Sequence, residues 1–328
     1  MQRAALAGAA LLTAGPLTTR VKADPDPPAG TPGGAGGLAE PEVFSFPFGG
    51  ADAFVVLDGV FTLPSIQPAF VPEAKPMEVE DLMQKSFLTA DHLSLSLNVL
   101  VLKTKSGVLL FDAGGGGAFG PACGKLVRGL KRIGIAPADV KTIFVTHAHS
   151  DHINGLVDAE NHPAFEQARV LAAKTEVDFW MSDSPNLSGM RTPAETTAQV
   201  AAGIKKVLTR AKSKLDLKEA GKLSPEVELL AAPGHTPGHS LFRVTQGNDK
   251  LLVIGDAVHV HALQFPHPEW TMAYDVDPAL AVKTRRKLFE EAAAERTMLL
   301  GYHMPFPGIG HVRAAGKGFE WVPRPWVA

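Results

Sequence analysis

From Val43 onward, short runs of apolar and β-branched residues alternate with groups of Gly, Pro, Asn and Asp. Runs of this length, bounded by turn residues, are typical of β-strands. The pattern predicts strands over residues 53–57, 95–103, 108–112, 141–146, 169–173, 227–231, 241–245, 251–255 and 297–301.

Three segments between these runs repeat apolar residues at intervals of three and four, which is the helical period. They are residues 121–133, residues 194–211 and a segment that begins at Asp277 and Pro278. Asp and Pro are favoured at the N-cap and at the first position of a helix, so the third helix is expected to begin there. Strands with helices between them predict a single sheet-rich α/β domain over residues 43–328.

The first 42 residues have a different composition. Arg3, the apolar run 4–12 and the small residues around Val21–Ala23 are typical of a secretory signal peptide over residues 1–23. Residues 24–42 are rich in Pro and Gly and predict a flexible leader. We therefore expect an exported protein, periplasmic or secreted. A disordered Ala-rich tail on a cytoplasmic protein is the alternative.

Charge and cysteine content narrow the choice of partners. The 328 residues carry 32 Lys and Arg against 34 Asp and Glu, a formal charge of −2. This balance argues against a nucleic acid or an anionic membrane as partner and favours a small neutral molecule. Cys123 is the single cysteine, so no disulfide can form within the chain. The apolar run at the N-terminus is too short to span a bilayer.

The densest group of reactive side chains directly follows the predicted strand 141–146. His147, His149, Asp151 and His152 place four potential metal ligands in six positions. A loop that leaves a buried strand can turn such side chains toward a common point. Imidazole and carboxylate groups bind zinc at about 2.0–2.2 Å, so they must converge on a small volume. This segment predicts a metal site, with a polar surface turn as the alternative.

Three further candidate ligands lie at the ends of other predicted strands. His235 stands in a Gly-His-Thr-Pro-Gly-His segment, Asp256 follows Gly255, and His303 follows Gly301 and Tyr302. A glycine allows the backbone to approach an ion closely. We expect these side chains to complete the site begun by the four ligands after residue 146.

Together, His-x-His-x-Asp-His, Gly-His-Thr-Pro-Gly-His, Gly-Asp and a C-terminal His resemble the motifs of the metallo-β-lactamase superfamily. The resemblance covers about residues 43–323. It implies a four-layer αββα sandwich with two divalent ions per chain, most typically zinc. It also implies that Asp112 orients a ligand histidine, although Asp112 could be a simple turn residue. The implied ligands are His147, His149 and His235 for one ion, Asp151, His152 and His303 for the other, and Asp256 for both.

Within this superfamily, the chain looks most like the methyl parathion hydrolase group, through residues 119–121, 178–180, 255–259 and 305–312. That resemblance implies an exported homodimer that hydrolyses aryl phosphotriesters or aryl esters. It assigns an aromatic wall of the substrate pocket to Phe119 and Trp180, and we add Phe265. A place in the core is the alternative for each. No aromatic residue stands at positions 190–193.

The acyl-homoserine-lactone lactonases share all seven ligands and give the alternative function. They carry a tyrosine three residues after the bridging aspartate, and His259 stands at that position. A neutral imidazole can also donate one hydrogen bond, so His259 is expected to assist the oxyanion.

The resemblance implies that a hydroxide bridging the two ions attacks an ester-like bond. Asp256 holds both ions, and Asp151 is expected to pass a proton to the leaving group as well as binding metal. Two other possibilities use the same scaffold: a non-catalytic metal-binding module and a nuclease. The first would be favoured by a missing ligand, and the second by a basic surface.

Overall fold

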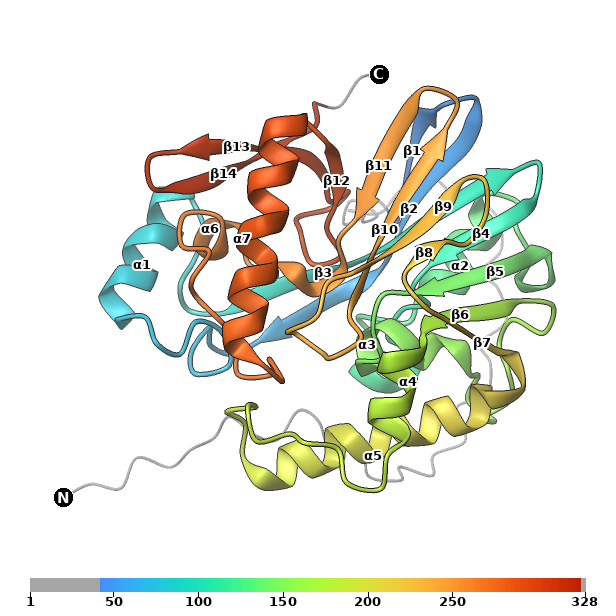
Figure 1. Ribbon diagram of the computed structural model, residues 1–328, viewed down its shortest axis with the longest axis horizontal. Helices are drawn as coiled ribbons and strands as arrows, with labels where there is room; N and C mark the ends of the chain where they lie inside the picture. The colour runs from blue at the N-terminus through green and yellow to red at the C-terminus, as the bar shows by residue number, and fades with distance from the viewer. Residues whose placement is uncertain (1–41, 326–328) are drawn as a thin grey trace, which may run out of the picture.

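The computed structural model describes residues 42–325 and contains two seven-stranded sheets that face each other, with helices on both outer faces (Figure 1). This is the expected four-layer αββα sandwich. The predicted signal peptide lies outside the described residues, as does the predicted leader except for Glu42.

The first sheet follows the order of the chain. Strands β1 to β4 are antiparallel; tight turns join β1 to β2 and β3 to β4, whereas a longer segment that includes a helix joins β2 to β3. Strands β4 to β7 run parallel and need longer crossovers. The strands are β1 (Val43–Phe48), β2 (Ala51–Leu63), β3 (Leu93–Thr104), β4 (Gly107–Phe111), β5 (Val140–Val145), β6 (Arg169–Ala173) and β7 (Leu215–Lys218).

The second sheet is antiparallel except for the pair β11–β12. In spatial order its strands are β14 (Gly318–Pro323), β13 (Ile309–Ala315), β12 (Met298–Leu300), β11 (Asp249–Val253), β10 (Ser240–Gln246), β9 (Val227–Ala231) and β8 (Gly221–Lys222).

An aromatic cluster joins the two sheets in the middle of the sandwich. Phe111 stacks on Phe144 with ring centroids 5.0 Å apart, and Phe242 of the opposite sheet lies 5.7 and 5.4 Å from them. All three side chains are buried. Burial of these apolar rings holds the two sheets in one alignment. The alignment in turn fixes the relative positions of the loops at the sheet edge.

Helices cover the outer faces of both sheets. The first sheet is covered by α2 (Leu126–Arg132), α3 (Ser150–Ile153), α4 (Lys174–Met181) and α5 (Ala194–Ala211), and the second by α7 (Pro278–Glu295). Two shorter helices, α1 (Pro76–Lys85) and α6 (His261–Gln264), lie beside each other at one end. Single turns of 3₁₀ helix are η1 (Gly116–Phe119), η2 (Pro137–Asp139), η3 (Asn154–Leu156), η4 (Lys212–Lys214) and η5 (Gly255–Ala257).

The helix predicted over residues 121–133 is shorter than expected. It begins at Leu126, because Gly124 has a φ of +79° that interrupts helical geometry. The helix over residues 194–211 is α5 itself. At α7, the side chain of Asp277 accepts a hydrogen bond from the Leu280 amide at 3.0 Å, as its predicted role as N-cap requires.

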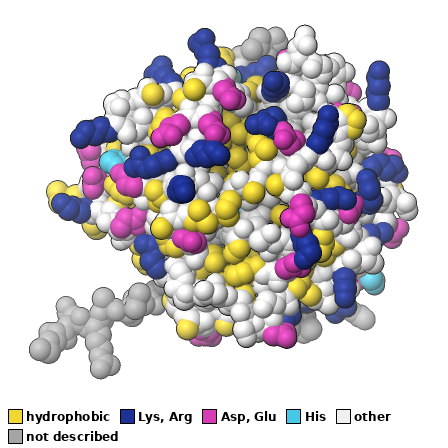
Figure 2. Space-filling model, in the orientation of Figure 1, with side chains coloured by type: hydrophobic (Ala, Val, Ile, Leu, Met, Phe, Trp, Pro, Cys, Tyr) yellow, Lys and Arg dark blue, Asp and Glu magenta, His cyan; other side chains and the backbone are white. Residues whose placement is uncertain are grey.

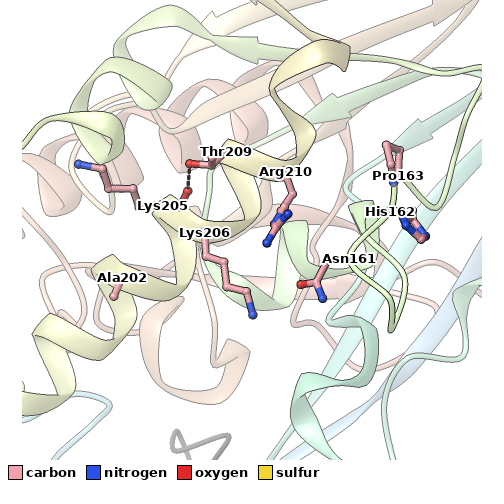
Figure 3. A pocket seen from close by; sticks show the side chains of 8 residues that line it. All are labelled: Asn161, His162, Pro163, Ala202, Lys205, Lys206, Thr209 and Arg210. Atoms are coloured by element: carbon pink, nitrogen blue, oxygen red, sulfur yellow. Dashed lines mark hydrogen bonds between the residues drawn. The ribbon is translucent and has the colours of Figure 1, made fainter. Parts of the chain in front are cut away.

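Acidic and basic side chains are interspersed on the face shown in Figure 2, in keeping with the small net charge. Within residues 42–325 no helix is long and apolar enough to cross a membrane. An open hollow of about 620 Å³ lies on the surface of α5, where Lys205, Lys206 and Arg210 line it (Figure 3). It shares no lining residue with the site described next.

Candidate metal centre

The segment after β5 supplies four of the predicted ligands. His147 and His149 lie in the short loop that follows the strand, and His149 is the N-cap of α3. Asp151 and His152 lie in the single turn of α3. The strand is buried along almost its whole length, so the loop leaves the sheet from a fixed position.

The other three ligands come from the second sheet. His235 lies between β9 and β10, Asp256 lies in η5 after β11, and His303 follows β12. The two sheets face each other and therefore bring together side chains that are more than 150 positions apart in the chain.

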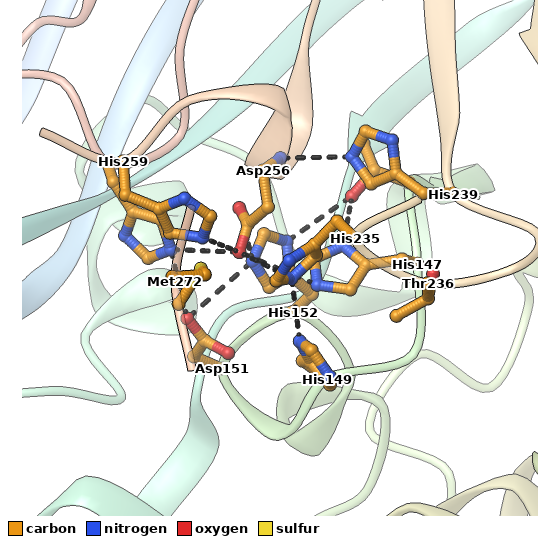
Figure 4. Close-up of polar contacts among 12 residues, drawn as sticks. His147, His149, Asp151, His152, His235, Thr236, His239, Asp256, His259 and Met272 are labelled. Carbon is orange, nitrogen blue, oxygen red and sulfur yellow. Dashed lines mark hydrogen bonds and ion pairs between the residues drawn. The ribbon is translucent and has the colours of Figure 1, made fainter. Parts of the chain in front are cut away.

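All seven predicted ligands converge into two groups that share Asp256. In each group one ligand atom per residue lies within 4.8 Å of the others. The Asp256 carboxylate is central, and its Oδ1 is 3.1 Å from His152 Nε2 (Figure 4). Its Oδ2 is 3.3 Å from His303 Nε2. The groups are His147, His149, His235 and Asp256, and Asp151, His152, Asp256 and His303.

The donor atoms in these groups fit two metal ions. His147 Nε2, His149 Nε2, His152 Nε2 and Asp256 Oδ1 are buried and have no hydrogen-bond partner within the described residues. Buried polar atoms are ordinarily paired, so four unpaired atoms directed at one region fit the binding of cations there. Burial lowers the pKa of His147 and His149 well below the usual value, which keeps both rings neutral as metal binding requires. His and Asp together are typical zinc ligands.

Asp112 lies at the end of β4 and orients one ligand, as the resemblance implied. Its Oδ2 is 2.8 Å from His152 Nδ1, and its Oδ1 accepts a hydrogen bond from the Thr146 amide, also at 2.8 Å. With Nδ1 bonded to the carboxylate, His152 directs Nε2 toward the second group. Asp112 has a φ of +65°, a conformation that asparagine and aspartate adopt more readily than most residues.

Sequence reasoning missed Asp275, which does for His235 what Asp112 does for His152. Its Oδ1 is 2.8 Å from His235 Nδ1, and its Oδ2 accepts a hydrogen bond from the Met272 amide at 3.0 Å. Asp275 lies 40 positions after His235 in a segment without regular secondary structure. No motif marks this position, so the contact appears only in the folded structure.

Glu176 in α4 was also missed, although it joins the two ligand-bearing loops. Its buried carboxylate accepts hydrogen bonds from the amides of Ala148 at 2.8 Å and Gly238 at 2.9 Å, and from the Thr236 hydroxyl at 2.7 Å. It thereby links the loop after β5 to the loop before β10. In the sequence Glu176 looks like an ordinary charged residue in the first turn of a helix.

His239, the second histidine of Gly-His-Thr-Pro-Gly-His, has a structural role. Its Nε2 accepts a hydrogen bond from the Asp256 amide at 3.0 Å, and its Nδ1 donates to the Ala232 carbonyl at 3.0 Å. Burial lowers its pKa to about 3, so Nε2 stays free to accept. A Cβ at Gly255, whose φ is +47°, would lie 2.8 Å from this nitrogen, so glycine is required there.

A cavity of about 300 Å³ opens onto the ligand groups, and its wall is mostly apolar. Phe119 lines it and meets Phe61 edge to face, with ring centroids 5.3 Å apart. Phe70 and Leu95 extend this wall. Arg191 also lines the cavity. It belongs to residues 190–193, which contain no aromatic residue.

The structure places Trp180 and Phe265 in the core, which corrects their predicted role in the substrate pocket. Trp180 is 1% exposed; its Nε1 donates to Glu176 and its ring lies 5.8 Å from that of His149, so it supports the site from behind. Phe265 is fully buried and stacks on Phe289 of α7 with centroids 4.4 Å apart. Each belongs to a helix-facing apolar cluster rather than to the cavity.

His259 lines the cavity, but its N–H bonds within the protein and not in the way that the predicted oxyanion role requires. Its Nε2 lies 2.9 Å from Asp256 Oδ2, so the proton on that nitrogen is donated to the carboxylate. Its Nδ1 is buried without a partner in the described part of the chain. Burial lowers the pKa of His259 to about 4, which leaves the ring neutral with a single N–H. His259 therefore orients Asp256.

Comparison with known proteins agrees with this geometry. AidC, a dizinc quorum-quenching lactonase solved with an N-acyl homoserine product, is 28% identical, with a TM-score of 0.84 over 87% of this chain and 98% of AidC. The hydrolase AbOPH of the β-lactamase superfamily is also 28% identical, with a TM-score of 0.80 over 88% of this chain and 99% of AbOPH.

Among curated proteins, an N-acyl homoserine lactonase of Bacillus thuringiensis is 26% identical over 180 residues, which are 55% of this chain and 62% of that protein. The match thus spans less than two thirds of that relative. None of these relatives is described as a methyl parathion hydrolase, so they support the broader family and not that group within it. The profile of the metallo-beta-lactamase superfamily matches residues 95–303. The chain belongs to the metallo-β-lactamase superfamily.

Proposed function

We propose that the protein is a dinuclear metal-dependent hydrolase that opens the ring of N-acyl homoserine lactones. The observation that carries the proposal is the convergence of seven His and Asp ligands into two groups sharing Asp256. The similarity to AidC over nearly the whole of that lactonase supports the lactone as substrate. Sequence reasoning ranked an aryl phosphotriester or aryl ester first, and these comparisons favour its alternative.

When bound by these ligands, two divalent ions would activate water at neutral pH and polarise the carbonyl oxygen of an ester. The chain's own groups hold and orient the reacting parts. Asp112 orients the ligand His152, and Asp275 orients the ligand His235. His259 orients Asp256. The apolar cavity accommodates the acyl chain and excludes water around the reacting bond.

Asp151 is the group placed to move a proton. Its carboxylate lines the cavity, and its Oδ2 is 3.3 Å from His303 Nε2. Burial opposes ionisation of this group, but His152 and His303 lower its pKa to about 2, so it is a carboxylate at neutral pH. It can accept the proton of the attacking water and return it to the leaving oxygen of the opened ring.

Aryl phosphotriesters or aryl esters are the second candidate class. The observation that favours them is the aromatic side of the cavity, where Phe61, Phe70 and Phe119 provide flat surfaces for an aryl leaving group.

A substrate panel on one zinc-loaded preparation tests the proposal. It compares N-hexanoyl homoserine lactone with an aryl ester and an aryl phosphotriester, for the wild type and for Phe119→Leu. We expect the lactone to have the highest kcat/KM. Phe119→Leu should reduce turnover of the aryl substrates more than that of the lactone, by about 1–3 kcal/mol in relative transition-state free energy. Absence of lactone opening by protein that carries two ions would overturn the proposed function.

A further inference from the structure

The cavity contains few polar side chains apart from the metal ligands and His259, and several of these are already bonded to the protein. Ser65 Oγ donates to the Gln67 carbonyl at 2.9 Å, and Thr192 Oγ1 lies 2.7 Å from Thr197 Oγ1. Arg191 is held by Glu73, by Thr271 and by the Met272 carbonyl. These groups are held by the protein and shape the cavity.

Three hydroxyls of the cavity wall are not bonded to any residue of the described chain: those of Ser150, Thr196 and Tyr274. Two of them belong to the α5 side of the cavity. Thr196 is part of α5, and Ser150 Oγ lies 4.0 Å from the position that a Cβ on Gly203 of α5 would occupy.

Tyr274 is on a different wall, in a segment that the protein holds from three sides. The neighbouring Ala273 donates its amide to the Ala69 carbonyl at 2.8 Å and accepts the Arg191 amide at 2.7 Å. The next residue, Asp275, bonds to His235. Tyr274 is therefore attached to the same rigid segment that orients a metal ligand, and its position relative to the centre is fixed.

The surroundings of Tyr274 favour a neutral phenol that donates. Its side chain is half-buried, and burial raises the pKa of the phenol, with a further contribution from the Asp151 carboxylate. The hydroxyl therefore keeps its proton at neutral pH. Tyr274 lines the same cavity as Asp151 and His303, two members of the second ligand group.

Two other groups that could serve the same purpose are already engaged. Tyr302, the second tyrosine of the chain, is 1% exposed; its hydroxyl donates to the Asp151 carbonyl at 2.7 Å and its ring stacks on His152. His259 donates its N–H to Asp256. Of the three side chains Tyr274, Tyr302 and His259, Tyr274 is therefore the one that lines the cavity and has a donor not used within the described residues.

We propose that the Tyr274 hydroxyl is a substrate-binding group that donates a hydrogen bond to the ester-like substrate, at the carbonyl oxygen that gains negative charge during attack. This inference rests on the proposed function for its substrate class. A preorganised donor at that oxygen stabilises the transition state more than the bound substrate. Tyr274 thereby complements the metal centre from the protein side of the cavity.

The variant Tyr274→Phe tests the proposal because it removes the hydroxyl and keeps the ring. On N-hexanoyl homoserine lactone, kcat should fall by about 10²-fold while the zinc content and the melting temperature stay at wild-type values. If the wild type turns over only an aryl ester or phosphotriester, the lactonase function fails, and the same kcat ratio measured on that substrate still decides the role of Tyr274.

A spectroscopic measurement on the wild type adds a readout that does not depend on turnover. Tyrosine labelled with ¹³C at the carbon that bears the hydroxyl gives two signals, because the chain has two tyrosines. Adding N-hexanoyl-L-homoserine to the zinc-loaded protein should shift the signal that is missing from the Tyr274→Phe spectrum. An unmoved signal at saturating product, or a wild-type kcat in Tyr274→Phe, would overturn the proposal.

Discussion

The buried carboxylates Asp112 and Asp275 each bond to the Nδ1 of a ligand histidine, at 2.8 Å in both cases. The pairing fixes the tautomer, since a proton on Nδ1 leaves Nε2 as the lone-pair donor. One carboxylate serves His152 in the second ligand group and the other serves His235 in the first. Each metal position thus has its own orienting aspartate.

Asp275→Asn should weaken zinc binding in the first group by about 10- to 100-fold, because an amide orients and polarises His235 less well than a carboxylate. Competition with a chromophoric chelator measures this affinity. Asp277→Ala, two positions further on, is the matched control: it removes the cap of α7 and should cost about 1 kcal/mol of stability without changing zinc affinity. Equal zinc affinity in both variants would show that Asp275 does not orient a ligand.

Cys123 should be almost unreactive in the native protein. The side chain is 7% exposed, and burial raises the pKa of its thiol to about 11. Because the thiolate is the reactive form, a pKa above the usual value means that little of it exists at pH 8. An aromatic disulfide reagent should label the native chain slowly at pH 8 and label one thiol per chain quickly in denaturant. Rapid labelling of the native chain would contradict the buried position.

The metal ligands could be predicted from the sequence because metal binding requires His and Asp side chains, and these stand in short motifs. Sequence reasoning could not separate cavity-lining aromatics from core aromatics. Phe119 and Trp180 are both large apolar residues near a motif, yet one lines the cavity and the other packs behind His149. That difference depends on which face α4 presents to the sheet, a property of the packed structure.

At the scale of elements, each of the nine predicted strands corresponds to a strand of the two sheets. The strands of the described residues that were missed are β1, β7, β8, β13 and β14, and all of these except β13 lie at the edge of a sheet. Edge strands have one unpaired side and less need for continuous apolar sequence, so their pattern is weaker. Helix α4 was also missed, because its eight residues are too few for a clear period.

Helix α7 anchors the segment between Asp256 and Tyr274 through one buried side chain. Arg285 is 1% exposed, and it donates to the carbonyls of Ala257 at 2.7 Å, Pro268 at 2.9 Å and Trp270 at 2.7 Å. Its guanidinium thereby satisfies one carbonyl in η5 and two in the loop that follows α6.

Arg285→Ala should reduce the free energy of unfolding by about 3 kcal/mol or more, because it leaves buried carbonyls without donors. The adjacent Arg286 is the matched control, since it is only partly buried and its side chain bonds only to the Glu269 side chain, at 2.9 Å, in the described structure. Arg286→Ala should cost less than about 1 kcal/mol. Urea unfolding of both variants measures the difference, and similar losses would show that Arg285 has no special anchoring role.

At the scale of the whole molecule, export and a homodimer remain predictions. We propose that residues 1–23 are removed on export, so that the mature protein begins near Asp24. Cells of the native host are separated into cytoplasmic and exported fractions, and N-terminal sequencing of the protein in each fraction identifies its first residue. A cytoplasmic protein that begins at Met1 would contradict the proposal.

The fold was predictable as a whole because the motifs imply it and the strand pattern agrees. The substrate was not, because selectivity depends on a cavity built from segments at residues 61–70, 191–200 and 272–274, which are far apart in the chain. The resemblance in sequence motifs suggested aryl substrates first, whereas the lactone that we propose as substrate rests on the similarity to AidC.

Titration of metal-free protein with zinc tests the central claim, a dinuclear centre that hydrolyses lactones, most directly. Ring opening of N-hexanoyl homoserine lactone is followed after each addition, with bound zinc measured by elemental analysis. We predict that turnover rises to a plateau at two ions per chain, because the two ligand groups share Asp256 and a two-metal centre needs both ions for hydrolysis. A plateau at one ion per chain, or two bound ions with no lactone opening, would contradict the account.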